Sequence, residues 1–181
     1  MKTALYIGRF QPFHKGHMDV LGHIDSEQDI GYIVIGIGSV QYHDRNKNPY
    51  SGWSKNCFTY EETKSMLERS LDIRKPYSIH PIPDFHDYDK WFRHIEEELP
   101  AFDCLYSNNK GDKDYFTERG YEVRPFPKIF DFCATRIREM IYNDEAYAST
   151  LPEGTLDVMG EIDGAERIRN LIAKDIAERL R

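Results

Sequence analysis

Short apolar runs and longer amphipathic stretches alternate along the first 150 residues. The apolar runs are rich in β-branched and aromatic side chains, which is typical of strands. Apolar residues recur at helical spacing between these runs. The pattern predicts strands at 3–7, 31–37, 77–82, 102–106 and 121–124, and helices at 16–25, 59–71, 88–99, 112–119 and 135–142.

This alternation predicts a parallel sheet with helices on both faces, the Rossmann-like, doubly wound α/β fold. The strands are continuously apolar, as expected when both faces of a sheet are covered. In such sheets, ligands bind beyond the carboxyl ends of the strands. We therefore expect the functional site at that edge.

The pattern changes near residue 150. Apolar residues then recur at helical spacing alone, and Asp163 with Glu166 resembles a capping box. We expect an α/β domain over 1–150 and a small C-terminal helical subdomain over 151–181, packed on it. Its apolar stripe comprises Leu156, Met159, Ile162, Ile168, Leu171, Ile172 and Ile176.

Composition narrows the class of protein. The chain has 181 residues, of which 40% are hydrophobic and 30% charged, with a net charge of −7. These values are ordinary for a soluble globular protein with a substantial core. An acidic chain lacks the broad basic surface that holds DNA or RNA, so no nucleic-acid partner is expected. A small nucleotide needs only a few converging cations.

Cysteine content and hydropathy indicate a cytoplasmic protein. The three cysteines, Cys57, Cys104 and Cys133, form no CxxC pair and are odd in number. They therefore suit neither a disulfide framework nor a zinc ribbon. No stretch approaches the roughly 18 apolar residues that span a bilayer, so no membrane partner is expected. A strand near the N-terminus leaves no signal-peptide pattern.

The segment 8–17, which reads Gly-Arg-Phe-Gln-Pro-Phe-His-Lys-Gly-His, joins the first predicted strand to the first predicted helix. It places His14 and His17 at a helix N-terminus, where unpaired amides and the helix dipole favour phosphate. Three residues apart, the imidazoles share one side of the first turn and can donate to phosphate oxygens. Gly16 permits close approach of a phosphate, and Arg9 is placed to reach a triphosphate or the acceptor phosphate.

A second cationic position follows near residue 135. Thr135 is expected to cap a helix whose first turn carries Arg138. A cation there is unfavourable for the helix dipole, so a bound phosphate would explain it. The plainer alternatives are capping or surface histidines, a solvated Arg9 and an ordinary salt bridge for Arg138. No third metal ligand lies at a familiar spacing, so no metal site is expected.

At these residues the chain resembles the nucleotidyltransferase superfamily with the HxGH motif. The form Gly-Arg-Phe-Gln-Pro-Phe-His is similar to that of nicotinamide-nucleotide adenylyltransferases of the archaeal type. The resemblance is nearly end to end, and the opening motif is its specific part. The other matching segments are 35–41, 48–50, Asp84, Trp91, 106–109, 120–123 and 161–168.

This resemblance implies transfer of the adenylyl group of ATP to nicotinamide or nicotinate mononucleotide, which yields the dinucleotide (NAD) and pyrophosphate in NAD biosynthesis. It implies Mg²⁺ carried by ATP and a homo-oligomer. The residues implied for catalysis are His14, His17, Lys47 and Arg138. Those implied for ATP are Gly8, Arg9, Phe10, Gly16, Ser39, Phe130, Cys133, Thr135 and Arg138, and those for the mononucleotide are Asp84, Trp91 and Asn108.

Several of these positions have alternative interpretations. Lys47 lies in a polar segment, 38–57, that is long for a mere connector. It is expected to close over pyrophosphate, and an exposed lysine is the alternative. Trp91 is expected to stack on a flat ring such as nicotinamide, or else to pack in the core. Asp84 is expected to accept a hydrogen bond from an amide or a ribose hydroxyl.

The sequence also departs from the family pattern. Cys133 stands where a serine begins the second signature, which removes a strong hydroxyl group. Lys47 replaces an arginine, so the bidentate fork is lost. Residues 52–56 resemble an insertion, and Thr63 stands where an arginine is usual.

Two other functions remain open from sequence. One is adenylyl or nucleotidylyl transfer to a different phosphate acceptor, of the phosphopantetheine or flavin type. The other is a non-catalytic, nucleotide-binding regulatory module, which the departures from the family pattern at Cys133 and Thr63 suggest.

Overall fold

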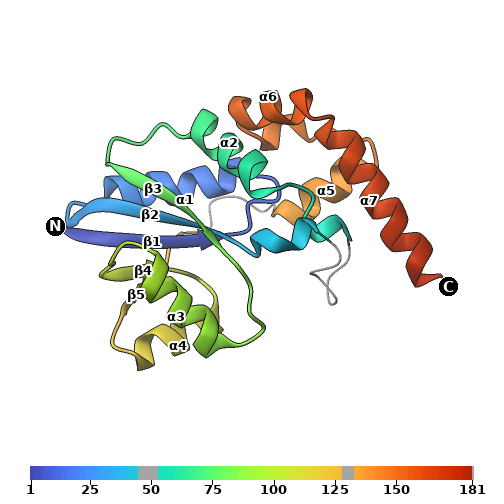
Figure 1. Cartoon of the computed structure of the whole chain (residues 1–181). Helices are drawn as coiled ribbons and strands as arrows, with labels where there is room; N and C mark the ends of the chain where they lie inside the picture. Colours follow the sequence, from blue (N-terminus) through green and yellow to red (C-terminus); the bar gives the residue numbers. More distant parts are fainter. Residues whose placement is uncertain (45–52, 128–132, 181) are drawn as a thin grey trace.

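The computed structural model describes residues 1–44, 53–127 and 133–180. Within them, five parallel strands form one sheet in the order β3-β2-β1-β4-β5. The first strand of the chain is thus the central one, and the strand order reverses beside it (Figure 1). The predicted doubly wound sheet is confirmed. The strands are β1 (Lys2–Gly8), β2 (Ile30–Gly38), β3 (Tyr77–Ile82), β4 (Cys104–Tyr106) and β5 (Glu122–Arg124).

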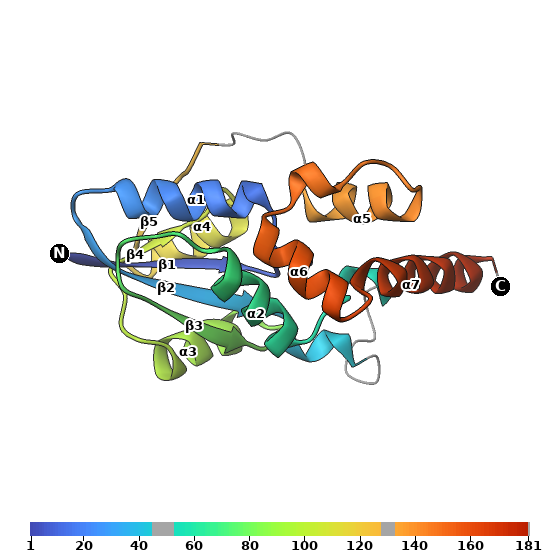
Figure 2. The same ribbon diagram turned by 90° about the horizontal axis from the view of Figure 1, so that it is seen from above.

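Helices cover both faces of the sheet. Figure 1 shows α1 and α2 on one side and α3 and α4 on the other. Figure 2 shows α5 and α7 beyond the carboxyl ends of the strands. The helices are α1 (Lys15–Ser26), α2 (Tyr60–Ser70), α3 (Tyr88–Glu98), α4 (Lys110–Glu118), α5 (Ala134–Tyr142), α6 (Glu153–Glu161) and α7 (Gly164–Arg179), with short 3₁₀ turns η1 (Val40–His43), η3 (Trp53–Lys55) and η4 (Ala148–Thr150).

Two apolar cores explain why the strands lack polar alternation. Successive side chains of β1 point to opposite faces of the sheet. Ala4 and Tyr6 belong to the core under α1 and α2, whereas Leu5 belongs to the core under α3 and α4. Leu5 pairs in register with Val34 of β2 and Leu105 of β4, and both join that second core. Because both faces of these strands are buried, apolar and polar residues do not alternate along them.

The C-terminal helices share the first of these cores. Leu151, Val158 and Ile168 are buried in the same cluster as Ala4. α6 packs on α2 so closely that a Cβ added at Gly154 would lie 2.4 Å from the Arg69 carbonyl oxygen. The helical nature of the tail agrees with the pattern, while a domain boundary at residue 150 stays a prediction.

Three helix caps test the finer predictions. Thr59 caps α2 as expected, because its hydroxyl accepts from the Glu62 amide at 3.2 Å. The prediction for α5 is wrong: its N-cap is Cys133, and the Thr135 hydroxyl instead accepts from Arg138. The predicted capping box at Asp163 is also wrong. Only two residues join α6 to α7, and Asp163 takes a left-handed backbone (φ 52°) without capping through its side chain.

No helix among the described residues is long and apolar enough to cross a membrane.

Candidate active site

Two cavities open at the carboxyl edge of the sheet, and they share Arg9 and Lys55. The first, of about 430 Å³, is lined by His14, His17 and the start of α5, and we call it the histidine cavity. The second, of about 670 Å³, is lined by the ends of β1 and β2, by Trp91 of α3 and by the first turn of α4. We call it the tryptophan cavity. The site therefore lies where the fold class predicts it.

Aromatic packing fixes the two motif histidines. His14 is the N-cap of α1, and its ring stacks on that of His17 with centroids 3.6 Å apart. Phe13 stacks on His17 at 5.7 Å, and Phe10 meets His17 edge-on at 4.9 Å. The His17 ring is thus held by neighbouring rings, and its position does not depend on a ligand.

Both imidazoles are neutral at neutral pH. Burial lowers the pKa of His14 to about 4. Burial, with the neighbouring His14, lowers the pKa of His17 well below its usual value. The His14 backbone N–H donates to Nδ1 of His17 at 3.3 Å, so the neutral ring carries its proton on Nε2. His17 is thereby a hydrogen-bond donor through Nε2.

Arg138 is a buried cation held by neutral groups. Its side chain donates to the Gln11 carbonyl oxygen at 2.6 Å and to the Thr135 hydroxyl at 3.2 Å. None of the ion pairs within the described ranges involves Arg138, which is 6% exposed. Burial lowers its pKa, and Arg9 nearby acts in the same direction. A buried guanidinium without a carboxylate favours an anionic ligand, because unpaired charge is costly to bury.

Gln11 ties the motif loop to the start of α2. Its side-chain amide donates to the Phe58 carbonyl oxygen at 3.1 Å and to the Thr63 hydroxyl at 3.2 Å, and its oxygen accepts from the Phe58 amide at 2.8 Å. Thr63, one of the departures from the family pattern, is fully buried in this link. Because the Gln11 carbonyl also holds Arg138, this link positions the buried cation.

Two glycines of the motif, Gly8 and Gly16, lie against aromatic side chains that a Cβ atom would crowd. A Cβ added at Gly8 would lie 2.6 Å from the Phe10 ring, and one at Gly16 would lie 3.1 Å from the His14 ring. Phe10 has a left-handed backbone (φ 53°) and is 1% exposed, so it serves packing while lining the histidine cavity.

The tryptophan cavity is assembled from several segments. Trp91 meets Tyr88 edge-on, with centroids 5.9 Å apart, at the start of α3. Asp84 lies in the loop before α3, and Gln41 clamps that loop: its amide donates to the Asp84 carbonyl oxygen at 2.6 Å and its oxygen accepts from the Asp84 amide at 3.1 Å. Ser39, in a left-handed conformation after β2, lines the same cavity.

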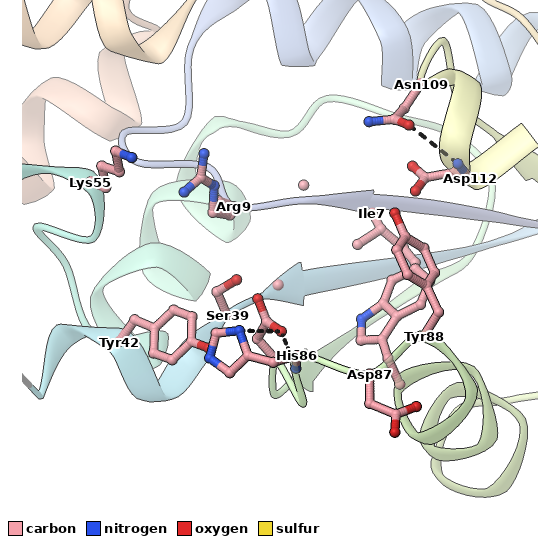
Figure 3. Close-up of a pocket in the computed structure, with 14 residues that line it drawn as sticks. Ile7, Arg9, Ser39, Tyr42, Lys55, His86, Asp87, Tyr88, Asn109 and Asp112 are labelled. Atoms are coloured by element: carbon pink, nitrogen blue, oxygen red, sulfur yellow. Dashed lines mark hydrogen bonds and ion pairs between the residues drawn. The ribbon is translucent and has the colours of Figure 1, made fainter. Parts of the chain in front are cut away.

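Lys55 is the functional candidate that the sequence interpretation missed. It lies on η3 and lines both cavities, and Figure 3 shows its side chain beside that of Arg9. Its neighbour Ser54 is held by Asp175 of α7, which accepts from the Ser54 amide at 2.9 Å and from its hydroxyl at 2.6 Å. A sequence signal exists: Lys55-Asn56-Cys57-Phe58 repeats the Lys-Asn-x-aromatic pattern of 47–50.

The structure divides the predicted residues between the two cavities. Gly8 and Ser39, expected at ATP, line the tryptophan cavity. Asn108, expected at the mononucleotide, lines the histidine cavity, and its side chain is bonded to the Phe126 backbone at 2.9 and 3.2 Å. Lys47 and Phe130 lie outside the described residues. The histidine cavity also collects Phe10, His14, Gly16, His17, Cys133, Thr135 and Arg138; Asp84 and Trp91 line the tryptophan cavity, and Arg9 lines both.

Comparisons of sequence identify relatives along nearly the whole chain. The profile of the cytidylyltransferase-like family matches residues 5–86. A nicotinamide-nucleotide adenylyltransferase of Thermoplasma acidophilum is 39% identical over 178 residues, which cover 96% of this chain and 94% of that protein. One from Methanococcus aeolicus is 40% identical over 176 residues, covering 95% and 96% of the two chains.

Solved structures agree in fold. A bifunctional NMN adenylyltransferase/ADP ribose pyrophosphatase of Francisella tularensis, complexed with AMP and a manganese ion, matches with a TM-score of 0.69 at 21% identity. The match covers 99% of this chain and 56% of that one. A putative nicotinate-nucleotide adenylyltransferase of Vibrio parahaemolyticus has a TM-score of 0.54 at 14% identity, covering 88% and 99% of the two chains. With full-length relatives near 40% identity, the chain belongs to the family of nicotinamide-nucleotide adenylyltransferases.

Proposed function

We propose that this chain transfers the adenylyl group of ATP to nicotinamide mononucleotide, releasing pyrophosphate and forming the dinucleotide NAD. The observation that carries the assignment to particular residues is the pair of cavities that meet at Arg9 and Lys55. One cavity offers donors for phosphate oxygens, and the other offers aromatic walls for a flat ring. Full-length relatives named for this activity support the same substrates.

The reaction requires little covalent chemistry from the protein. A phosphate oxygen of the mononucleotide attacks the α-phosphorus of ATP and forms a new P–O bond. The bond from the α-phosphorus to the bridging oxygen breaks, and pyrophosphate leaves with its electron pair. Positioning of the two phosphates and stabilisation of the developing charge therefore supply the rate.

In this proposal the triphosphate of ATP occupies the histidine cavity. His17 donates from Nε2, His14 lies against it, and Arg138 offers its buried charge to the phosphates. Gly16, Cys133 and Thr135 border the same space. Because the imidazoles are neutral before ATP binds, they provide N–H donors without repelling each other.

The mononucleotide occupies the tryptophan cavity. Its phosphate lies toward Arg9 and Lys55, where the two cavities meet, and its ring lies toward Trp91. Asp84 is held by Gln41 within reach of this cavity. The α-phosphorus then lies at the boundary, where two cations flank both reacting groups. Gly8 and Ser39 are accordingly assigned to the mononucleotide.

A divalent cation enters with ATP. In the part of the chain that the structure describes, no group of three or more His, Cys, Asp or Glu side chains could hold a metal ion. The phosphates of the nucleotide supply most ligands of Mg²⁺ in such complexes. We therefore assign no metal-ligating residue.

The test is product formation from ATP, Mg²⁺ and nicotinamide mononucleotide, with dinucleotide and pyrophosphate measured in equal amounts. The variant His17→Ala should lower kcat about 10²- to 10³-fold, the usual cost of one donor to developing charge. His23→Ala, in the last turn of the same helix and outside both cavities, is the matched control and should retain activity.

Parallel reactions with phosphopantetheine and flavin mononucleotide examine other acceptors. Preferential use of either would contradict the proposed substrate, and a folded protein that binds ATP yet forms no product would contradict the proposed reaction. Full activity of His17→Ala would remove His17 from its assigned role.

A further inference from the structure

The tryptophan cavity carries opposite charges at its two ends. Figure 3 shows Arg9 and Lys55 at one end, and Tyr88 and Asp112 at the other. Under the proposed function, the mononucleotide's phosphate lies at the cationic end. The substituent on its pyridine ring must then approach the end that contains Asp112.

Asp112 has an acceptor to spare at the end of the cavity beside Tyr88. It lies in the first turn of α4, and one of its oxygens accepts from the Ser107 hydroxyl at 3.1 Å. Across the described ranges, no hydrogen bond or ion pair reaches its other oxygen. Burial raises the pKa of the Asp112 carboxyl, as expected where water is partly excluded.

The other two carboxylates that line the cavity have different roles. Asp84 accepts from the His86 amide at 2.9 Å, and the His86 ring is hydrogen-bonded to the Tyr42 hydroxyl. Asp87 is the N-cap of α3 and accepts from the Lys90 amide at 3.0 Å. Figure 3 shows the Asp87 carboxylate directed away from the cavity. Asp84 also keeps one oxygen without a hydrogen bond or ion pair among the described residues, but its loop is held against Gln41 and His86. Asp112 is the carboxylate that lies beside Tyr88 at the end opposite Arg9 and Lys55.

Aromatic rings surround the same end. The Tyr88 and Trp91 rings meet at 78°, which forms a corner. The Tyr88 hydroxyl faces Asp112 in Figure 3, and a Cβ added at the adjacent Gly111 would lie 3.3 Å from that hydroxyl. A cationic pyridinium ring is attracted to such π faces. Both pyridine mononucleotides contain that ring, so the aromatic corner binds either of them, and only the substituent distinguishes the two.

We infer that Asp112 determines the choice of acceptor: it selects the neutral carboxamide of nicotinamide mononucleotide and disfavours the carboxylate of nicotinate mononucleotide. This inference rests on the proposed function. A carboxamide N–H can donate to the spare oxygen of Asp112. A ring carboxylate would instead face a like charge in a half-buried place, where repulsion is weakly screened. Specificity then arises from repulsion of the wrong acceptor as well as attraction of the right one.

The test is the ratio of kcat/KM values for the nicotinamide and nicotinate mononucleotides. The wild-type ratio should be at least about tenfold in favour of nicotinamide. Asp112→Asn should lower that ratio about tenfold, mainly by raising the nicotinate value. Its amide oxygen still accepts from Ser107, and its NH₂ group can donate to the ring carboxylate.

Asp87→Asn is the matched control, because it removes the same charge from the same cavity. Asparagine caps a helix as well as aspartate does, so α3 stays capped. This variant should leave the ratio within about twofold of wild type, since an exposed charge off the contact is largely screened. Calorimetric binding of both mononucleotides to each protein gives a second readout that does not depend on turnover.

Three results would overturn the inference: equal use of both acceptors by the wild-type protein, an unchanged ratio and unchanged affinities in Asp112→Asn, or an equal shift in Asp87→Asn. In each case adenylylation continues, so the proposed function stands. If the wild-type protein adenylylates neither mononucleotide, the proposed function fails and this inference falls with it.

Discussion

The two cavities differ in how the chain builds them. Most of the histidine cavity comes from one contiguous segment, 8–17, and from the first turn of α5. The tryptophan cavity instead draws on the ends of two strands, the loop before α3 and the start of α4. The histidine cavity is thus encoded locally, whereas the tryptophan cavity depends on the assembled sheet.

Their charges differ as well. Among the described residues, those that line the histidine cavity include Arg9, Lys55 and Arg138 but no carboxylate. The tryptophan cavity adds three aspartates to Arg9 and Lys55. A polyanion therefore fits the first, and a ligand with a phosphate at one end and a cationic ring at the other fits the second.

Substitution of Arg138, which lines the histidine cavity and not the tryptophan cavity, is the strongest test of this difference. Arg138→Met should lower kcat/KM for ATP about 10³-fold, because the buried charge that the phosphates meet is lost. Stability should stay within about 1 kcal/mol of wild type, since the desolvation cost of an unpaired guanidinium offsets its hydrogen bonds. Initial rates and thermal unfolding measure the two effects.

The control for Arg138 is Arg136→Met in the same helix. Arg136 is exposed and paired with Glu145 at 2.5 Å, outside both cavities. It should leave kcat/KM unchanged. A large loss of stability in Arg138→Met would mean that the guanidinium stabilises the folded protein. The absence of a carboxylate partner would then not indicate ligand binding.

The buried imidazoles give the second prediction, a pH-dependent stability. The pKa of His14 is about 4 when folded and near 6.5 when unfolded, so between these values the unfolded chain binds more protons. The free energy of unfolding should therefore fall as the pH falls from 6.5 to 4. The expected loss from His14 alone is about 3 kcal/mol, at 1.36 kcal/mol for each unit of pKa difference.

Denaturant titrations at a series of pH values measure this loss. His14→Asn, which cannot titrate and still suits an N-cap, should remove the His14 share of the slope between pH 6.5 and 4. His17, whose pKa is also lowered by burial, keeps its own share. The ion pairs of Asp29 weaken only at lower pH, because Arg124 holds its pKa at about 2. An identical slope in wild type and variant would show that His14 is not the source.

The substitution of Lys55 has the smallest expected effect and tests whether this residue contacts the ligands of both cavities. Because it lines both, Lys55→Met should raise KM for ATP and for the mononucleotide together, by about tenfold each. Lys64→Met, a change at a half-buried position on α2 that removes a pairing with Glu68 at 3.7 Å and lies outside both cavities, is the control. A rise in only one KM value would assign Lys55 to a single cavity.

The sheet and the histidine cavity are predictable from sequence for a physical reason. Continuous apolar strands and amphipathic helices leave only one way to bury their faces, as Leu5 and Ala4 on opposite sides of β1 illustrate. The motif histidines lie at the start of a helix, in the short segment that joins this helix to the first strand. Their proximity is therefore set by local geometry and requires no knowledge of the tertiary fold.

Features that depend on tertiary packing cannot be predicted from sequence in the same way. The sequence places Lys55 in a segment that resembles an insertion, because nothing local reveals that α7 anchors η3 through Asp175. The resemblance implies ATP for Ser39, whereas the structure places Ser39 in the tryptophan cavity, because strand order decides which cavity the end of β2 faces. Asp112 has no motif of its own, and only the packing of α4 beside α3 brings it to Tyr88.

The anchoring of Ser54 by Asp175 connects the final helix, α7, to the turn that carries Lys55 at both cavities. Arg167 adds a second tie from the same helix, through its 2.7 Å pairing with Glu62 at the start of α2. A hydrogen bond between Ser54 and Asp175, 121 residues apart in the chain, thus holds the backbone next to Lys55. Under the proposed function, a substitution in α7 that removes the Asp175 contact to Ser54 would then lower kcat while the apolar core stays folded.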